Sequence, residues 1–195
     1  SLRCLVALFV ALNTLNYVDR GIIPGASEEF EAFICDSRDL GARGCRHAST
    51  FLGLLQSVFI AGFSVASVVA SNLVHRVSPF AVVGGGLVVW CAAVLLSAAA
   101  APARLYALLC VGRMLSGVGE ASFQCVAPPL IADRAGRAKG KLLALYYTAM
   151  PAGTALGYWY GAAFAARRER GWAAAFAIEA LVMAPFAAWC FSLKA

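Results

Sequence analysis

The sequence predicts an all-α membrane protein with six transmembrane helices, and two observations carry this prediction. Of its 195 residues, 62% are hydrophobic and 13% are charged, whereas a soluble domain usually contains about 25% charged residues. The apolar residues fall into six blocks, each close to the roughly 20 residues that an α-helix needs to cross the hydrocarbon core. The predicted spans are Leu2–Ile23, Phe51–Leu73, Phe80–Ala99, Leu105–Ala132, Leu142–Ala165 and Trp172–Leu193.

The first block also fits a secretory signal peptide, because a short apolar run near an amino end can be an h-region. Its polar residues Asn13, Asn16, Asp19 and Arg20, and the lack of a small-residue cleavage pattern, favour instead a spanning helix that lines a polar space. The chain begins without Met, and its last predicted span ends two residues before the terminus. We therefore expect residues 1–195 to be a six-helix unit of a longer protein.

Short connections join the predicted spans, except for residues 24–50, which we expect to be an extramembrane loop with a short surface helix. The net charge of +6 would suggest a nucleic-acid partner in a soluble protein. Most Lys and Arg residues lie in the connections, however, where membrane topology explains them, and the basic stretch DRAGRAKGK favours a cytosolic amino end. The expected partners are the lipid bilayer and a small-molecule or lipid substrate, not nucleic acid.

Seven cysteines are present, and five of them lie in apolar blocks, where a thiol behaves as a small hydrophobe. Cys35 and Cys45 lie in the long loop. A disulfide between them would form if the loop faces an oxidising compartment and the two residues are close. The sequence leaves both conditions open.

The fourth predicted span carries two formal charges, Arg113 and Glu120, inside an apolar run. An ionisable group near the bilayer centre costs roughly 2.5 to 3.5 kcal/mol on insertion scales, and such groups usually face a polar cavity and function there. Seven residues at 100° each place the two side chains on one helix face, with a rise of about 10 Å between them. Gly117 and Gln124 continue this face. Because this rise would stretch a direct ion pair, each charge needs a partner from another helix.

Asp19 is the predicted partner of Arg113. With alternating spans, the end of the first helix and the start of the fourth lie on the same side of the membrane. A nearby cation favours the charged form of a carboxyl group and apolar surroundings favour its neutral form, so movement of the arginine would load or release a proton. We interpret Asp19, Arg113 and Glu120 as proton-coupling residues. The alternative, a buried network that only fixes helix register, stays open, and no specific partner is predicted for Glu179.

Other polar residues and glycines complete the candidate set. The cavity or gating candidates are Asn16, Tyr17, Arg20, Gln56 and Gln124. Small residues at four-residue spacing let two helix backbones approach closely. The glycines expected to pack helices are Gly117, Gly119, Gly153, Gly157 and Gly161. We expect the last three to face helices that are absent from this chain.

The sequence offers little for catalysis or metal binding. It contains two histidines, no paired metal-ligand spacing and no HExxH motif. Ser116 lies in LSGVG, which lacks the first glycine and the strand of a nucleophile elbow. We therefore expect neither an enzyme nor a metal site nor a cofactor.

Four stretches resemble the major facilitator superfamily, and within it the Spinster-like lipid transporters, over nearly the whole chain. LNTLNYVDR at 12–20 resembles the NYxDR signature of helix one, and GLLQSVFIAGF at 53–63 is similar to the opening of helix two. GRMLSGVGEASFQCVAPPLIAD at 112–133 matches the RxxxGxG pattern of the superfamily and the GEAS and AP…IAD features of Spinster proteins. LYYTAMPAGTALGYWYG at 145–161 resembles the helix-five segment.

This resemblance implies the N-terminal half of the superfamily fold, built from two inverted three-helix repeats, with a C-terminal six-helix half as its partner. It implies alternating-access transport of a sphingolipid or lysophospholipid. It also implies that Asp19, Arg113 and Glu120 occupy the positions at which the family is thought to couple proton and substrate movement. The alternatives are a facilitator of a small organic anion or metabolite, and a non-transporting membrane scaffold or receptor.

One motif departs from the superfamily pattern. Where the family usually has GxxxDRxGR[KR] between helices two and three, this chain reads SNLVHRVSP from Ser71 to Pro79, with His75 at the acidic position. The resemblance therefore implies a cytoplasmic latch that is weakened or made differently.

Overall fold

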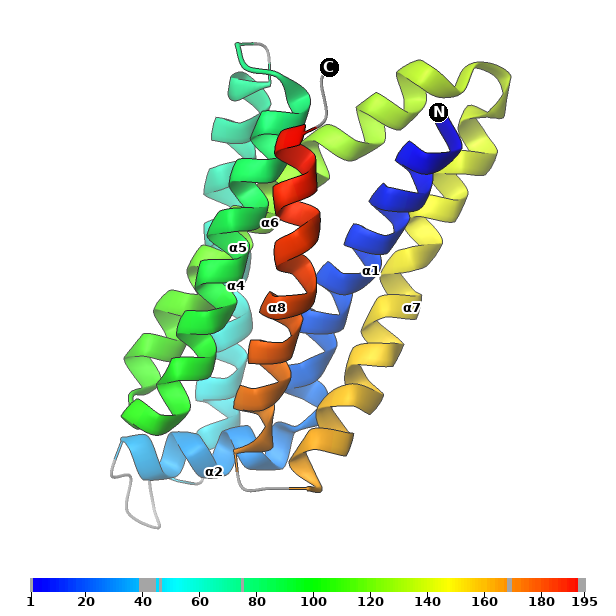
Figure 1. The fold of residues 1–195 in the computed structure, drawn as a ribbon. Helices are drawn as coiled ribbons and strands as arrows, with labels where there is room; N and C mark the ends of the chain where they lie inside the picture. Colours follow the sequence, from blue (N-terminus) through cyan, green and yellow to red (C-terminus); the bar gives the residue numbers. More distant parts are fainter. Residues whose placement is uncertain (1, 39–44, 46, 75, 168–169, 193–195) are drawn as a thin grey trace.

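A computed structural model describes residues 2–38, 45, 47–74, 76–167 and 170–192. Within them each of the six predicted spans forms a long helix, and these helices pack as a bundle (Figure 1). The long helices are α1 (Leu2–Gly25), α4 (Ala48–Leu73), α5 (Pro79–Ala103), α6 (Tyr106–Ala135), α7 (Lys139–Ala165) and α8 (Gly171–Ser192). A short helix, α2 (Ser27–Ser37), follows α1, and a 3-10 turn, η1 (Gly136–Ala138), joins α6 to α7.

Four of the long helices, α1, α4, α5 and α8, are long and apolar enough to cross a membrane. The other two, α6 and α7, have 30 and 27 residues, which is sufficient length at about 1.5 Å per residue. Their charged and weakly apolar residues lower their hydropathy. Some helices extend beyond the predicted blocks: α4 begins at Ala48 and α5 ends at Ala103. Backbone hydrogen bonding continues past the apolar block in both cases.

The stretch from Ser71 to Pro79, which departs from the superfamily pattern, lies at the junction of α4 and α5. Ser71 is in the last turn of α4, where its hydroxyl lies 3.7 Å from the Cys125 sulfur, and Pro79 begins α5. Proline suits this position because the first turn of a helix does not use its backbone N–H groups. His75 lies outside the described residues.

A glycine ladder on α7 packs directly against α1. Gly153, Gly157 and Gly161 are buried. A methyl group would lie 2.5 Å from the Thr14 carbonyl oxygen if added at Gly153 and 2.6 Å from the Ile22 carbonyl oxygen if added at Gly161. The expectation that this ladder faces helices absent from the chain is therefore wrong, because α1 covers it. The four-residue spacing showed close packing but could not identify the partner.

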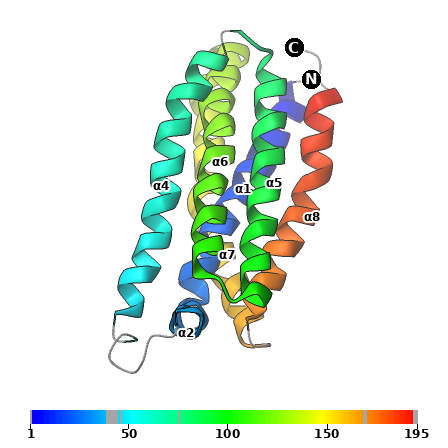
Figure 2. The same ribbon diagram turned by 90° about the vertical axis from the view of Figure 1, so that its left-hand side faces the viewer.

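Two glycines let α6 lie close to both of its neighbours. In Figure 2, α6 runs between α4 and α5. A methyl group at Gly117 would collide with the Phe59 carbonyl oxygen of α4, and one at Gly119 would lie 2.6 Å from the Trp90 amide nitrogen of α5. The polar face of α6 is thereby held at a fixed position in the bundle.

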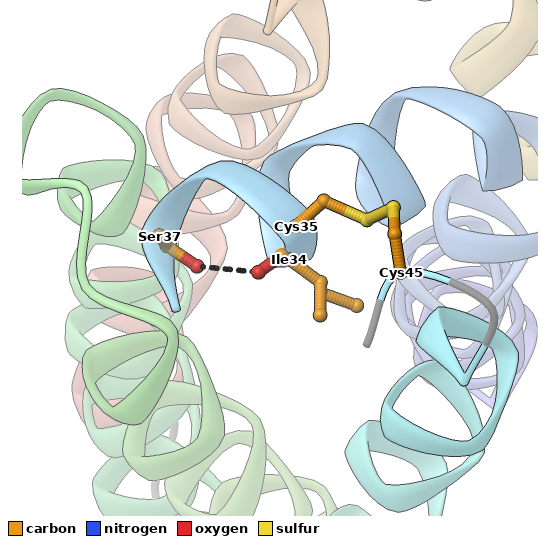
Figure 3. The surroundings of a disulfide bond; sticks show 4 residues. All are labelled: Ile34, Cys35, Ser37 and Cys45. Atoms are coloured by element: carbon orange, nitrogen blue, oxygen red, sulfur yellow. Dashed lines mark hydrogen bonds between the residues drawn. A yellow bond between two sulfur atoms is a disulfide. The ribbon is translucent and has the colours of Figure 1, made fainter. Parts of the chain in front are cut away.

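The short helix α2 lies across one end of the bundle (Figure 1) and corresponds to the surface helix expected between residues 24 and 50. Its apolar face is buried: the ring centroids of Phe30 and Phe33 lie 4.5 Å and 5.2 Å from that of Trp172 at the start of α8. Cys35 and Cys45 form a disulfide with a Cα–Cα distance of 5.4 Å (Figure 3). This bond ties α2 to the segment just before α4.

Candidate functional site

The buried charges of α1 and α6 meet in the interior of the bundle. The Arg113 guanidinium donates a 2.7 Å hydrogen bond to Asp19, and neither side chain is exposed. The Ser116 hydroxyl lies 3.5 Å from the second Asp19 oxygen. This ion pair is the one that the alternating topology predicts. Removing one partner of a buried pair typically costs about 3 to 5 kcal/mol, because the other charge is left without compensation.

A second ion pair joins the same two helices. Arg20 donates two hydrogen bonds to Glu120, of 2.8 Å and 3.2 Å, in the forked geometry that suits guanidinium and carboxylate. The Glu120 side chain is fully buried, whereas 28% of the Arg20 side chain is exposed. Helical side chains lean toward the amino end of their helix, so Arg20 reaches back along α1 beyond the level of Asp19. Sequence reasoning predicted a partner on another helix for Glu120 but did not identify it.

Gln124 extends this network toward α7. Its amide donates a 2.9 Å hydrogen bond to Asn13, and its carbonyl oxygen accepts a 2.8 Å bond from the Tyr146 hydroxyl. The Asn13 amide in turn donates to the Tyr146 backbone carbonyl at 3.0 Å. Three helices are therefore linked by one set of side chains. Sequence reasoning missed Tyr146, whose only signal was a hydroxyl within an apolar helix.

Aromatic rings cover both guanidinium groups. The Phe59 ring of α4 lies 4.6 Å from the Arg20 guanidinium and 5.2 Å from that of Arg113. Tyr17 packs on Arg20 at 4.8 Å, and Phe176 of α8 on Arg113 at 5.6 Å. Each contact contributes roughly 0.5 to 2 kcal/mol, more when the cation is desolvated. In the sequence, Phe59 and Phe176 are indistinguishable from ordinary core residues.

Two candidates stand outside these hydrogen bonds. Gln56 is half-buried in α4, one turn before Phe59, and has no hydrogen bond to the network in the described part of the chain. Asn16 is fully buried, but neither polar atom of its amide has a partner among the described residues. Those residues also contain no group of three His, Cys, Asp or Glu side chains that could hold a metal ion.

An apolar groove lies between α4 and α6 and is lined in part by exposed side chains such as Val65 and Val69. It has a volume of about 460 Å³, within the usual range of small-molecule sites. On α6 the groove lies on a different face from Arg113, because Met114, Val118 and Ser122 are about 100° to 180° from Arg113 around the helix. The lining residues include Gly62, Val65, Val69, Met114, Val118 and Ser122.

Comparison with known proteins places this architecture in a family. The sequence profile of the Major Facilitator Superfamily matches residues 9–195. The chain belongs to the major facilitator superfamily. Together with its apolar helices, this membership identifies an integral, multi-pass membrane protein, and its relatives in the superfamily are transporters rather than enzymes.

The similar members of the superfamily include Spinster proteins. The probable sphingolipid transporter spinster homolog 1 of Arabidopsis thaliana is 37% identical over 196 residues, which cover 97% of this chain and 39% of that protein. Protein spinster homolog 1 of Homo sapiens is 34% identical over 157 residues, covering 79% and 27% of the two chains. A sphingosine-1-phosphate transporter of Xenopus tropicalis is 33% identical over 147 residues, covering 75% and 26%. The chain thus spans less than half the length of each of these relatives.

Proposed function

We propose that this chain is the amino-terminal half of a Spinster-like transporter that couples proton movement to alternating-access transport of a sphingolipid or lysophospholipid. The observation that carries the proposal is the presence of two salt bridges between α1 and α6, Asp19 with Arg113 and Arg20 with Glu120. Ionisable residues within transmembrane segments are rare and usually mark ion or substrate pathways. The partner in this proposal is a second six-helix half outside residues 1–195.

Protonation offers a way to change the strength of these bridges. A proton on Asp19 removes the negative charge that holds Arg113, and a proton on Glu120 does the same for Arg20. The α1–α6 contact is then weakened without any change of sequence or fold. In a protein with two global states, such a change shifts the population toward the state that needs the contact least. In the proposed architecture, α1, α4 and α5 form one three-helix repeat, and α6, α7 and α8 form its inverted counterpart.

Two features support a substrate with an anionic head and an apolar tail. Two nitrogens of the Arg113 guanidinium, Nε and one terminal nitrogen, have no hydrogen-bond partner among the described residues. The apolar groove between α4 and α6, with a volume of about 460 Å³, offers apolar side chains to a lipid tail. The open donors alone would equally suit a small organic anion, which is the second candidate substrate class. The two classes differ in whether transport requires an apolar tail on the substrate.

The test uses the protein that contains this chain and its second half, reconstituted in liposomes. A labelled lysophospholipid, a sphingosine phosphate and tail-free organic anions are offered with and without a pH gradient. We expect the lipids to move in a proton-dependent way, and Asp19→Asn and Glu120→Gln to lose that dependence. The matched control is Glu28→Gln, at an exposed residue of α2, and this variant should transport normally. Unchanged transport in both network variants would defeat the coupling role, and transport of tail-free anions alone would favour the second class.

A further inference from the structure

Glu179 of α8 is a buried acid that neither ion bridge uses. Its exposed fraction is 4%, and neither carboxyl oxygen has a hydrogen-bond partner in the described part of the chain. The polar centre contains two cations, Arg20 and Arg113, which are already matched by the carboxylates of Asp19 and Glu120. A third carboxylate would be an uncompensated buried charge, which proteins avoid because desolvation is so costly. The third carboxyl group therefore needs either a proton or a cation.

Glu179 lies at the same depth as the Asp19–Arg113 pair. Asp19, Arg113 and Glu179 lie six, seven and eight residues from the ends of α1, α6 and α8 that meet on the α2 side of the bundle (Figure 1). At 1.5 Å per residue these positions are roughly 9 to 12 Å inside the helix ends. Phe176, one turn before Glu179, places its ring on the Arg113 guanidinium. Glu179 also lies within Coulombic range of both Asp19 and Arg113.

The groups that surround α8 at this level include a single cation. From α1 comes Asp19 and from α6 comes Arg113. From α5 comes Cys91, whose thiol lies 3.8 Å from a backbone carbonyl oxygen of α8, and from α7 comes Tyr160, whose hydroxyl donates to another at 3.2 Å. In the described part of the chain, Arg113 is thus the one positive group available to Glu179. Arg113 also has unbonded N–H groups at Nε and a terminal nitrogen.

We propose that Glu179 is the second carboxyl partner of Arg113, carrying a proton while Asp19 holds the guanidinium and taking over the guanidinium when Asp19 is protonated. In this exchange one O–H bond forms on Asp19 and one breaks on Glu179. One proton is bound and one released, and Arg113 stays paired with one carboxylate throughout. The proposal deepens the coupling role proposed above for Asp19 and Arg113, and rests on it. It makes Glu179 a positioning residue that acts through the arginine.

Infrared spectroscopy tests this exchange independently of transport. The purified protein in lipid at neutral pH should show the C=O stretch of a protonated carboxylic acid that is shielded from exchange. Glu179→Gln should remove this band. Asp19→Asn should also remove it, because Glu179 then ionises to hold Arg113. Arg113→Gln should enlarge it, since both carboxyl groups lose their cation. Glu28→Gln, on the surface of α2, should leave it unchanged.

Two results would overturn the proposal. A band that survives in Glu179→Gln belongs to another group, and a band that survives in Asp19→Asn shows that Glu179 does not replace Asp19. If the Gln variant does not fold, Glu179→Asp keeps a carboxyl group one methylene shorter, and the band should shift rather than persist unchanged. A failure of proton-dependent transport with the spectral pattern intact would count against the proposed function and not against the exchange.

Discussion

The α1–α7 contact makes a quantitative prediction for Gly157→Ala. The added methyl carbon would collide with the Val18 carbonyl oxygen and lie 2.8 Å from both the carbonyl carbon and the Cα of Val18. Carbon atoms pack at about 3.5 to 4.0 Å, so α1 and α7 must separate by roughly 0.7 to 1.2 Å. The obstacle is backbone on both sides, and no side chain can rotate to relieve it. Overpacking of this kind typically costs about 1 to 3 kcal/mol.

Gly53→Ala is the matched control, because it makes the same chemical change in α4. A methyl group there would meet no heavy atom within 4 Å in the described part of the chain. Alanine is more favourable than glycine in a helix by roughly 0.5 to 1 kcal/mol, so this variant should be as stable as the parent or slightly more stable. The two substitutions should therefore change stability in opposite directions.

Reversible unfolding in mixed micelles measures both variants against the parent protein. We expect the Gly157→Ala transition to move to lower denaturant and the Gly53→Ala transition to stay or move higher. Equal stability of Gly157→Ala and the parent would show that α7 does not touch the backbone of α1. A similar loss in both variants would show that the effect comes from glycine content rather than from contact.

Two further predictions concern the ends of the network and of the bundle. Tyr146→Phe removes the hydroxyl that donates to Gln124 at 2.8 Å and should lower stability by about 1 to 3 kcal/mol, because a partly buried acceptor loses its donor. Tyr147→Phe, at a tyrosine that is 46% exposed, should change stability little. Equal losses in the two variants would contradict the assignment. Alkylation should add two labels at Cys35 and Cys45 only after reduction. Reducing this disulfide, which closes a loop with a sequence separation of 10, should lower the free energy of unfolding by about 3 kcal/mol by the loop-entropy relation. Labelling of Cys35 or Cys45 without reductant would contradict the disulfide.

The sequence predicted the fold and one ion pair because both follow from one-dimensional information. Six apolar blocks of spanning length require six helices, since lipid leaves no other way to satisfy the backbone of isolated spans. Alternation of the spans then fixes which helix ends share a side of the membrane. Asp19 and Arg113 are matched in depth by this rule alone, and the structure pairs them at 2.7 Å.

The partner of Glu120 depends on information that the sequence does not contain. Arg20 pairs with Glu120 because its long side chain reaches back along α1 to a deeper level. Depth counted from helix ends cannot reveal this reach. For the same reason, the spacing of Gly153, Gly157 and Gly161 predicted close packing but not the identity of α1 as the neighbour. Pairing and neighbourhood depend on helix rotation and side-chain conformers, which emerge only when all the helices pack together.

For Glu179, by contrast, the depth of the side chain in the bundle can be inferred from the sequence. The same depth rule that pairs Asp19 with Arg113 places Glu179 beside them, because α8 begins on the side where α1 ends and α6 begins. The rule does not give the rotation of α8 about its axis, because an acid at that depth can face either the lipid or the interior of the bundle. The position of Phe176 on the Arg113 guanidinium resolves the rotation of α8.

The two sides of α1 are held by interactions of different kinds, and this difference bears on how the bundle can move. On one side, the backbone of α1 touches the glycines of α7, as at Gly157 against Val18, and such a contact does not depend on protonation. On the other side, α1 is joined to α6 through Asp19 with Arg113 and Arg20 with Glu120. These bonds weaken when a carboxylate takes up a proton. A protonation event therefore leaves the α1–α7 contact unchanged and weakens the ion pairs between α1 and α6, while the hydrogen bonds of Gln124 with Asn13 and Tyr146 still join α6 to both helices.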